Sequence, residues 1–416
     1  MKKILTALLL LAAPLAALAQ GLVGDMLELP SMHKYEAEVV AKAAKAATQA
    51  EARAILLEHA DKSWAGAPLF FNLANACYRL GDYAEAAKHY EAALAKRKFF
   101  HAYKNLGYAL SASGKSEEAR GAFLRALAIS GGSDADILLW LADFHARRGD
   151  IGAALAMCDQ ALVYEPSNGA VCLAKCRFLL ELELYAQAEK FSAEMYSKTS
   201  DARYLRLRAR AQLGARDFRS AAASIELLKA AGAAEPGDAA LLGDLYFTLG
   251  DFRGAARIYS ALGDGKKLEN AALACVNAGD FDGARRAAGA IKTPAREKLL
   301  GIAELRAGNL KSAAGLLEKY CAASPSDMLA AAELADALAG LGRYRESLSV
   351  FSRLKADASY RRRAMHGILR CALACEDYFY ALSAAREISR EYPSAEIADF
   401  EKKLAAYCNE LEKPAQ

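Results

Sequence analysis

The sequence predicts an all-α protein, a solenoid in which about ten helix pairs stack on one another. Within residues 67–99, apolar residues recur at the i, i+3, i+4, i+7 spacing of a helix face, before and after a Gly-Asp-Tyr turn at 81–83. That turn pattern returns about every 34 residues along the chain. Ala and Leu are abundant and only 9 of 416 residues are Pro, which favours helices. Because one helix pair cannot bury both of its faces, each pair needs neighbours of its own kind.

Residues 1–19 have the pattern of an export signal: two lysines, a short apolar run, and a small-x-small cleavage site at 17–19. Cleavage there would make Gln20 the mature N-terminus. An uncleaved anchor is the alternative, but the apolar run is shorter than the roughly 20 residues that a membrane span needs. The first cysteine is Cys77, so none is placed to carry a lipid at the cleavage site. We therefore expect a soluble exported protein with no transmembrane segment after cleavage, periplasmic rather than secreted to the medium.

The mature chain then divides into a cap, two sets of repeats and a final helix. The opening segment predicts two Ala-rich helices, near 33–47 and 49–62, which lack the turn glycine and form a degenerate first pair that caps the stack. The last segment has one apolar stripe and a Glu- and Lys-rich face, typical of a capping helix. The predicted boundaries are 1–19 (signal), 20–66 (N-terminal cap), 67–235 (repeats 1–5), 236–394 (repeats 6–10) and 395–416 (C-terminal cap).

Each repeat carries the same small set of residue types. A large residue beside a tiny one in the first helix, such as Leu106-Gly107, lets the second helix approach closely, and a small residue follows the turn by three positions. Buried aromatic residues are predicted to fill the space between units: Tyr90, Phe123, Tyr259 and Phe351. This pattern resembles the tetratricopeptide-repeat family over nearly the whole mature chain. The resemblance implies a right-handed superhelical solenoid whose concave face is lined by the first helices.

Some repeats depart from the pattern. Glu183 stands in the fourth unit and Cys375 in the tenth where the turn glycine is expected, so we expect those turns to be looser or differently shaped. The segment 230–265 is rich in Ala and Gly and includes a shortened unit. It predicts either a hinge between two five-repeat halves or a change of superhelical pitch, and the sequence does not separate these alternatives.

The sequence gives little support for catalytic activity or for a bound cofactor. No phosphate-binding glycine loop, nucleophile elbow or His-Glu-x-x-His motif occurs, and none of the six histidines is spaced with a cysteine as a zinc-ligand pair. We predict no enzyme activity, no cofactor and no metal. A formal net charge of +4 is too weak to indicate nucleic acid as a partner.

The nine cysteines fall mostly on the packed faces of helices, which predicts buried thiols acting as small apolar side chains. If a disulfide exists, the pair to expect is Cys158 with Cys172 or Cys176, since consecutive helices should bring them together.

The first two repeats supply the strongest candidate site. By the resemblance, their concave positions form an aromatic and amide-rich patch suited to an extended peptide. Asn75 and Asn105 fall on the amide positions of the family's carboxylate clamp, but Phe71, Asp136 and Trp140 occupy its cationic positions, so a true clamp is not expected. Ordinary groove lining is the alternative. The predicted peptide-binding residues are Phe71, Asn75, Tyr78, Arg79, His101, Lys104, Asn105 and Tyr108.

The fifth repeat carries an arginine-rich face whose core is Arg203, Arg206 and Arg210, suited to an acidic partner. The alternative is an ordinary solvent-exposed helix face.

Together these features predict a non-enzymatic scaffold or adaptor of the bacterial cell envelope, which binds a peptide segment of a partner envelope protein in its groove. The alternative function is binding of an anionic polysaccharide or another acidic ligand through the arginine face.

Overall fold

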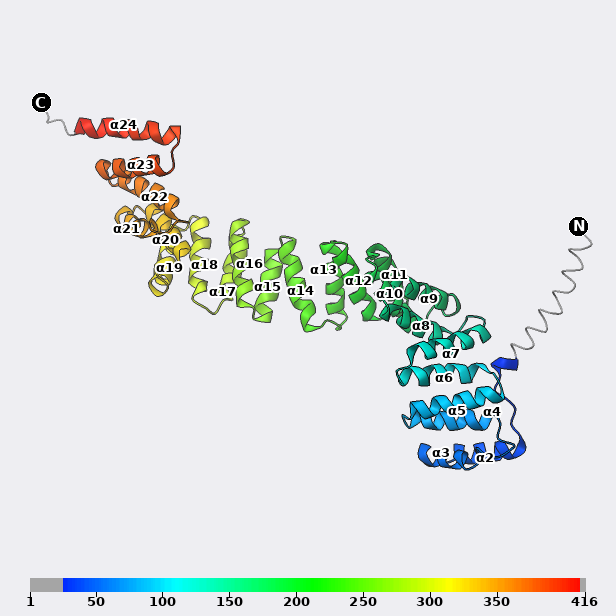
Figure 1. Cartoon of the computed structure of the whole chain (residues 1–416). Coiled ribbons are helices and arrows are strands. Elements are labelled where there is room, and N and C mark those ends of the chain that lie inside the picture. Colours follow the sequence, from blue (N-terminus) through cyan, green and yellow to red (C-terminus); the bar gives the residue numbers. More distant parts are fainter. Residues whose placement is uncertain (1–24, 412–416) are drawn as a thin grey trace, which may run out of the picture. The chain divides into compact units, whose positions relative to one another are not determined.

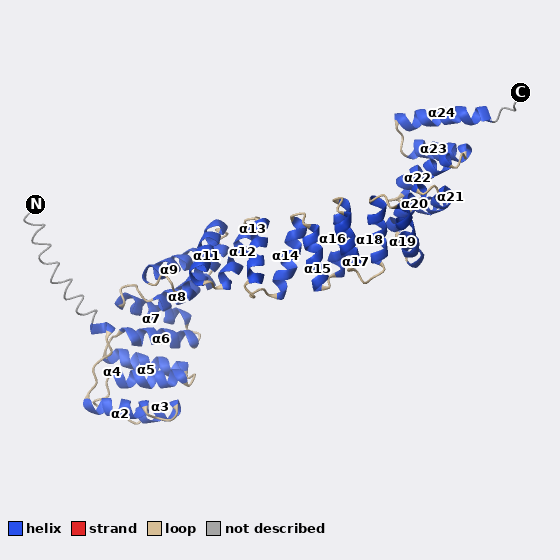
Figure 2. Cartoon of the chain, turned by 180° about the vertical axis from the view of Figure 1, so that it is seen from behind, coloured by secondary structure: helices blue, strands red, loops and turns tan. Residues whose placement is uncertain are grey.

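The computed structural model describes residues 25–411, so the predicted signal at 1–19 and the start at Gln20 lie outside the described residues. All regular structure from 25 to 411 is helical, and no strand occurs there (Figure 2). Successive helices lie side by side along each unit (Figure 1). The predicted all-α fold is confirmed. None of the helices in this range is long and apolar enough to cross a membrane.

The described part of the chain forms two compact units, which divide between Ala215 and Arg216. The sequence boundary between repeats at 235/236 stays a prediction, and the division seen here places α12 and α13 in different units. The helices of the first unit are α2 (Lys34–Ala44), α3 (Gln49–Leu57), α4 (Ala67–Arg79), α5 (Tyr83–Lys96), α6 (Phe100–Ala112), α7 (Ser116–Ile129), α8 (Ala135–Arg147), α9 (Ile151–Tyr164), α10 (Gly169–Glu181), α11 (Tyr185–Thr199) and α12 (Ala202–Gly214).

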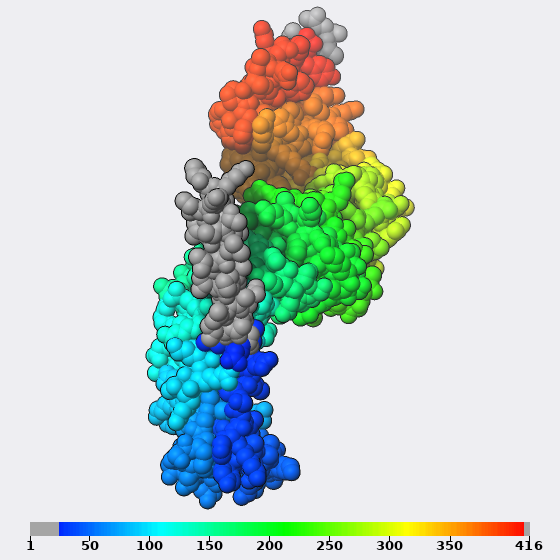
Figure 3. Space-filling model, turned by 90° about the vertical axis from the view of Figure 1, so that its right-hand side faces the viewer, coloured from blue at the N-terminus to red at the C-terminus, as the bar shows by residue number. Residues whose placement is uncertain are grey.

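Within each unit the helices follow one another in space in chain order, as the colours of the space-filling view show (Figure 3). The helices of the second unit are α13 (Phe218–Ala230), α14 (Pro236–Thr248), α15 (Phe252–Leu262), α16 (Gly265–Asn277), α17 (Phe281–Gly289), α18 (Ala295–Arg306), α19 (Leu310–Ala323), α20 (Met328–Gly340), α21 (Tyr344–Leu354), α22 (Arg361–Ala374), α23 (Tyr378–Glu391) and α24 (Ala395–Leu411).

Ten helix pairs share one turn geometry, in which the residue between the two helices is left-handed. Glycine takes this position in seven turns, and Glu183 (φ 56°), Arg216 (φ 60°) and Glu376 (φ 60°) take it in the others. The next residue donates its N–H to the carbonyl five positions back, at 3.0 Å for Asp82 and 2.9 Å for Leu184. The expectation of looser turns in repeats four and ten was therefore wrong. A non-glycine residue costs about 1 kcal/mol in this conformation, which packing on both sides can offset.

The core alternates small residues with large ones, as the repeat pattern predicts. A Cβ placed on Gly107 would lie 2.6 Å from the Phe123 ring, and one on Gly367 would lie 2.5 Å from the Phe351 ring. Gly107 lets α6 approach the aromatic residue of its own partner helix α7, and Gly367 lets α22 approach Phe351 of α21, the second helix of the preceding pair. The four aromatic residues predicted to fill the interior are all buried: Tyr90, Phe123, Tyr259 and Phe351.

The N-terminal cap is held on the first repeat by one buried carboxylate. Glu36 of α2 is 2 % exposed and accepts hydrogen bonds from the backbone N–H groups of Gly66 (3.0 Å) and Leu69 (2.9 Å). Gly66 is the N-cap residue of α4 and offers no side chain to cap the helix. Glu36 therefore satisfies the free N–H groups of α4 and places a negative charge at its positive end.

Candidate interaction surfaces

The predicted peptide-binding patch lies on the neighbouring first helices α4 and α6. Asn105 Nδ2 donates to Asn75 Oδ1 at 3.1 Å, and the Tyr90 hydroxyl donates to the same oxygen at 2.6 Å. The helix holds Asn75 in this position because Ala74 and Ala76 on either side of it are buried, and Asn105 is followed by the buried Leu106. The structure thus brings the two asparagines together and fixes Asn75, and the Asn105 amide also interacts with the Tyr90 hydroxyl.

Two half-buried tyrosines of the patch keep their hydroxyl groups free. The Tyr78 ring packs on Tyr83 with 5.1 Å between centroids, and the Tyr108 ring packs on Phe123 at 5.0 Å. Neither hydroxyl makes a hydrogen bond within residues 25–411. Burial raises the pKa of Tyr108 to about 12, so its hydroxyl remains protonated at neutral pH. The rings are rigid and the hydroxyls are available to an acceptor.

Trp140 of α8 continues this aromatic row. Its ring lies 4.6 Å from Phe123 and stacks at 5.5 Å on Phe144, and its indole N–H donates to Ser111 Oγ at 3.0 Å. The sequence analysis treated Trp140 only as an obstacle to a carboxylate clamp. Its place in the first helix of the third repeat, at one end of a row of aromatic residues, was the signal that would have included it. We use the name aromatic-amide face for Asn75, Tyr78, Asn105, Tyr108 and Trp140.

The other predicted patch residues have different surroundings. Phe71 is partly buried and packs on Tyr90 and Phe99 at the edge of the core. Lys104 is bound to Asp134 at 2.8 Å and Asp136 at 3.0 Å, and its side chain is only 18 % exposed, so its charge is already neutralised. Exposed members of the patch that make no ion pair with another described residue are Arg79 and His101.

The arginine face of α12 is partly neutralised. The Arg203 side chain donates three hydrogen bonds to Asp201, the N-cap of its own helix, at 3.1, 2.9 and 2.6 Å. Arg208 lies on another side of the helix, 3.7 Å from Glu189. Arg210 is exposed and makes no ion pair with any residue of 25–411. The acidic-partner face over Arg203, Arg206 and Arg210 stays a prediction, and the charge of Arg203 in it is bound to Asp201.

Comparison of the sequence with protein-family models agrees with an architecture of repeated helix pairs. Two sequence profiles described as tetratricopeptide repeat match the chain, one at residues 71–134, 104–170 and 298–361 and the other at 145–211. The chain is a tetratricopeptide-repeat protein. No curated protein matches this repeat protein.

Solved structures with a similar course of the chain include the APC/C hetero-tetramer Cut9-Hcn1, at 14 % identity and TM-score 0.33, covering 86 % of this chain and 80 % of that one. The C-terminal part of a TPR repeat-containing protein from Cytophaga hutchinsonii matches at 16 % identity and TM-score 0.42, covering 62 % and 93 %. Naa15/Naa10 bound to HypK-THB matches at 14 % identity and TM-score 0.41, covering 91 % and 67 %.

All nine cysteines of this tetratricopeptide-repeat protein are free thiols, and seven of them are buried. Burial raises the pKa of Cys158 and of Cys176 to about 12, so these thiols stay protonated and unreactive at neutral pH. They behave as small apolar side chains, as expected, and the optional bridge from Cys158 is not formed. No group of three metal-ligating side chains occurs among the described residues.

Proposed function

We propose that this tetratricopeptide-repeat protein is a non-enzymatic adaptor of the bacterial cell envelope that binds an extended segment of a partner protein on its aromatic-amide face. The fold supports the general role of a protein-interaction scaffold. The free hydroxyl groups of Tyr78 and Tyr108 carry the more specific proposal. They stand on rigid, half-buried rings beside the Asn75–Asn105 pair.

This arrangement suits the backbone of a peptide. An extended segment presents carbonyl groups at regular spacing, and phenol and amide groups can donate to them without requiring a particular side chain. Rigid aromatic rings give contact area at low cost in conformational entropy. Because Lys104 is bound to two aspartates, the face does not select for acidic peptides.

The test uses dodecapeptides selected from a random display library on the full mature chain, with binding measured by fluorescence anisotropy. Tyr78→Phe combined with Tyr108→Phe removes only the two hydroxyls and leaves the rings in place. With about 0.5–1.5 kcal/mol per hydrogen bond, we expect the dissociation constant to rise about tenfold. Phe71→Ala is a poor test because that ring packs against the core.

The matched control is Tyr164→Phe, which removes the hydroxyl of a 49 % exposed tyrosine on the second helix α9. It should leave the affinity unchanged. Equal affinity in the double variant and the native chain, or failure of the native chain to select any peptide, would contradict the proposal.

The envelope location is part of the same proposal and has its own test. The lysines, apolar run and small-x-small site within residues 1–19 support export. Expressed with its own N-terminus in a two-membrane bacterium, the protein should appear in the osmotic-shock fraction and begin at Gln20. A full-length chain that remains with the cytoplasm would overturn the location and leave the peptide site to be judged separately.

A further inference from the structure

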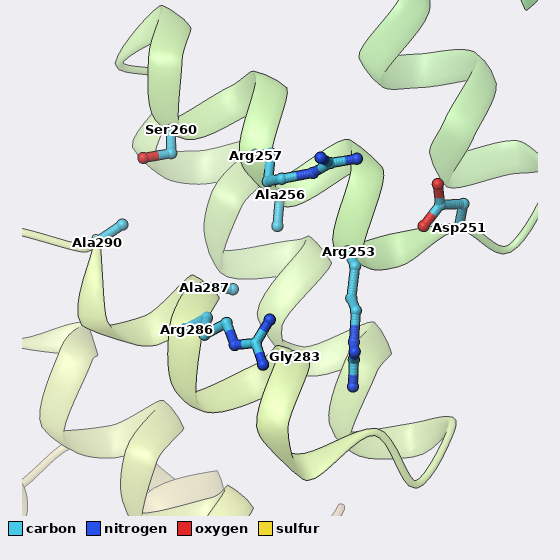
Figure 4. Close-up of a pocket in the computed structure, with 9 residues that line it drawn as sticks. All are labelled: Asp251, Arg253, Ala256, Arg257, Ser260, Gly283, Arg286, Ala287 and Ala290. Carbon is cyan, nitrogen blue, oxygen red and sulfur yellow. The ribbon is translucent and has the colours of Figure 1, made fainter.

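The second unit contains a cavity of about 500 Å³ beside two of its short second helices, α15 and α17 (Figure 4). The helix α15 has 11 residues and α17 has 9, whereas second helices such as α5 and α19 have 14. The left-handed turn residues of these repeats lie only 29 apart, from 250 to 279 and from 279 to 308. The cavity is within the size range of ligand sites. Its lining residues are Asp251, Arg253, Ala256, Arg257, Ser260, Gly283, Arg286, Ala287 and Ala290.

One of the three arginines in this cavity is fixed as part of its wall. The Arg253 guanidinium binds both oxygens of Asp280, and Asp280 accepts the Gly283 N–H at 3.0 Å as the N-cap of α17. A Cβ on Gly283 would collide with the Asp280 carboxylate and lie 3.0 Å from Arg253 Cγ. The ion pair can therefore lie against the helix only because residue 283 has no side chain.

The other two arginines are free to bind a ligand. Arg257 and Arg286 are exposed and make no ion pair or hydrogen bond with any other side chain of residues 25–411. In Figure 4, Arg286 extends from α17 toward the side of the cavity where Arg253 lies. The buried residues Ala256 and Ala287 form a small-residue floor that allows close approach. With Arg253 paired to Asp280, the lining still has two free cations against the one carboxylate of Asp251, so it attracts an anion.

A second depression of about 870 Å³ adjoins the first and shares Ser260 and Ala290 with it. Lys292 and Arg296 line this part, are exposed, and make no ion pair within the described chain. Lys319 there is bound to Glu297 at 3.1 Å. The four cations without a carboxylate partner thus lie along two joined depressions. We call this surface the basic groove and define it by Arg257, Arg286, Lys292 and Arg296.

We propose that the basic groove binds an acidic peptide segment of a protein partner, at a site independent of the aromatic-amide face. Guanidinium groups bind carboxylates through paired hydrogen bonds, and several carboxylates along an extended chain can meet cations spread over two depressions. No aromatic ring lines the first depression, and the Tyr320 ring in the second is half-buried and has Lys298 Nζ over it, 5.9 Å from its centroid, while its hydroxyl donates to Asp327 at 2.9 Å. The groove thus lacks the open aromatic surface on which a sugar ring would stack, which favours a peptide over an anionic glycan.

The experiment measures binding of fluorescein-labelled decaglutamate to the full mature chain and to Arg257→Glu combined with Arg286→Glu. Because neither arginine has a partner, the variant should fold, which circular dichroism checks. We expect its affinity for decaglutamate to fall at least tenfold, and Arg257→Gln with Arg286→Gln to lose less. Binding by the native chain should also weaken as salt is raised.

Two arms keep the proposal open to refutation. The matched control Arg345→Glu with Arg362→Glu reverses two exposed charges of the same unit outside the groove and should stay within about twofold of the native affinity. If both double variants lose the same affinity for decaglutamate, the binding depends only on the net charge of the protein, and the proposed site is wrong. Polygalacturonate, offered as a competitor, tests the other ligand class: groove-dependent binding tighter than that of decaglutamate would overturn the peptide assignment.

Discussion

The first helices of the two units occupy equivalent positions in their repeats but differ in how their polar groups are satisfied. In the first unit, Tyr78 and Tyr108 keep free hydroxyls beside the Asn75–Asn105 pair. In the second unit, the helices α18, α20 and α22 are joined by ion pairs. Their contacts are Arg306–Glu333 (2.9 Å), Arg363–Glu333 (3.1 Å), Arg363–Asp336 (2.5 Å) and Arg370–Asp336 (2.6 Å).

The difference shows that one scaffold position can serve either packing or recognition. Glu333 is 2 % exposed, so its charge needs both arginines around it. A ligand that displaced them would leave that carboxylate unpaired, so this face of the second unit is a poor place for binding. The amides and phenols of the first unit carry no charge, and a ligand can engage them without uncovering a buried ion.

The largest effect should come from breaking the ion-pair row of the second unit. Arg363→Leu leaves buried Glu333 with one partner and Asp336 with one, and we expect a loss of about 3 kcal/mol in the free energy of unfolding. Arg370→Leu is the matched change, since Arg370 also binds Asp336 but its side chain is 61 % exposed. It should cost less than about 1 kcal/mol. Urea unfolding followed by circular dichroism measures both, and equal losses would contradict the role of burial.

A second pair of variants tests what the two units share. Gly107→Ala and Gly367→Ala each place a methyl group against a buried ring, Phe123 or Phe351, and each should cost about 2 kcal/mol. Their fluorescence should differ, because both tryptophans lie in the first unit and Trp140 contacts Phe123. Gly107→Ala should change the tryptophan emission of the folded protein and Gly367→Ala should not. A neutral result at either glycine would show that the ring can move aside.

The shared framework is also what the sequence could predict. Alternating small and large residues and a turn every 34 residues define helix pairs, because each contact they dictate lies within a pair or between neighbours. The wrong expectation at Glu183 arose because glycine is the cheapest left-handed residue but not the sole one that packing can hold there. The end of the cap pair was also predicted too late, at 62, since α3 ends at Leu57.

The site could be predicted only in part, for a related reason. The repeat register places Asn75 and Asn105 on neighbouring helices, and their hydrogen bond follows from it. Which charges are already neutralised depends on side chains about 30 residues away, as for Lys104 with Asp134 and Arg363 with Glu333. The basic groove was missed because it depends on the length of α15 and α17 rather than on a motif.

A smaller effect concerns one contact that both units contain. Lys104 binds Asp134, the N-cap of α8, at 2.8 Å, and Lys298 binds Asp327, the N-cap of α20, at 2.7 Å. Replacing either lysine by Met keeps the aliphatic stem and removes the charge, at an expected cost of about 1 kcal/mol. Hydrogen exchange should localise the loss to the helix whose cap was weakened. Protection that falls equally in both units would contradict a local role.

The smallest effect is a loss of stability of the second unit at acid pH, which should follow from the contact between Lys298 and Asp327. Burial alone would raise the pKa of Asp327, but hydrogen bonds from Lys298 and the Ala330 N–H outweigh it and hold the pKa below its ordinary value. A carboxyl whose pKa is lower when folded adds stability above its unfolded pKa of about 3.9, and loses it as the pH falls through the folded value.

The contribution of Asp327 to the free energy of unfolding should therefore be constant between about pH 5 and pH 8 and should decrease below about pH 4. Lys298→Met should be less stable than the native chain at neutral pH, and the two should converge as the pH falls through the lowered pKa of folded Asp327, below which this carboxyl is protonated in both. Urea unfolding at several pH values measures this. If the difference in free energy of unfolding between the two proteins is as large in acid as at neutral pH, Lys298 stabilises the unit through the packing of its aliphatic stem. The Lys298–Asp327 and Lys104–Asp134 contacts would then share their geometry but not an electrostatic contribution to stability.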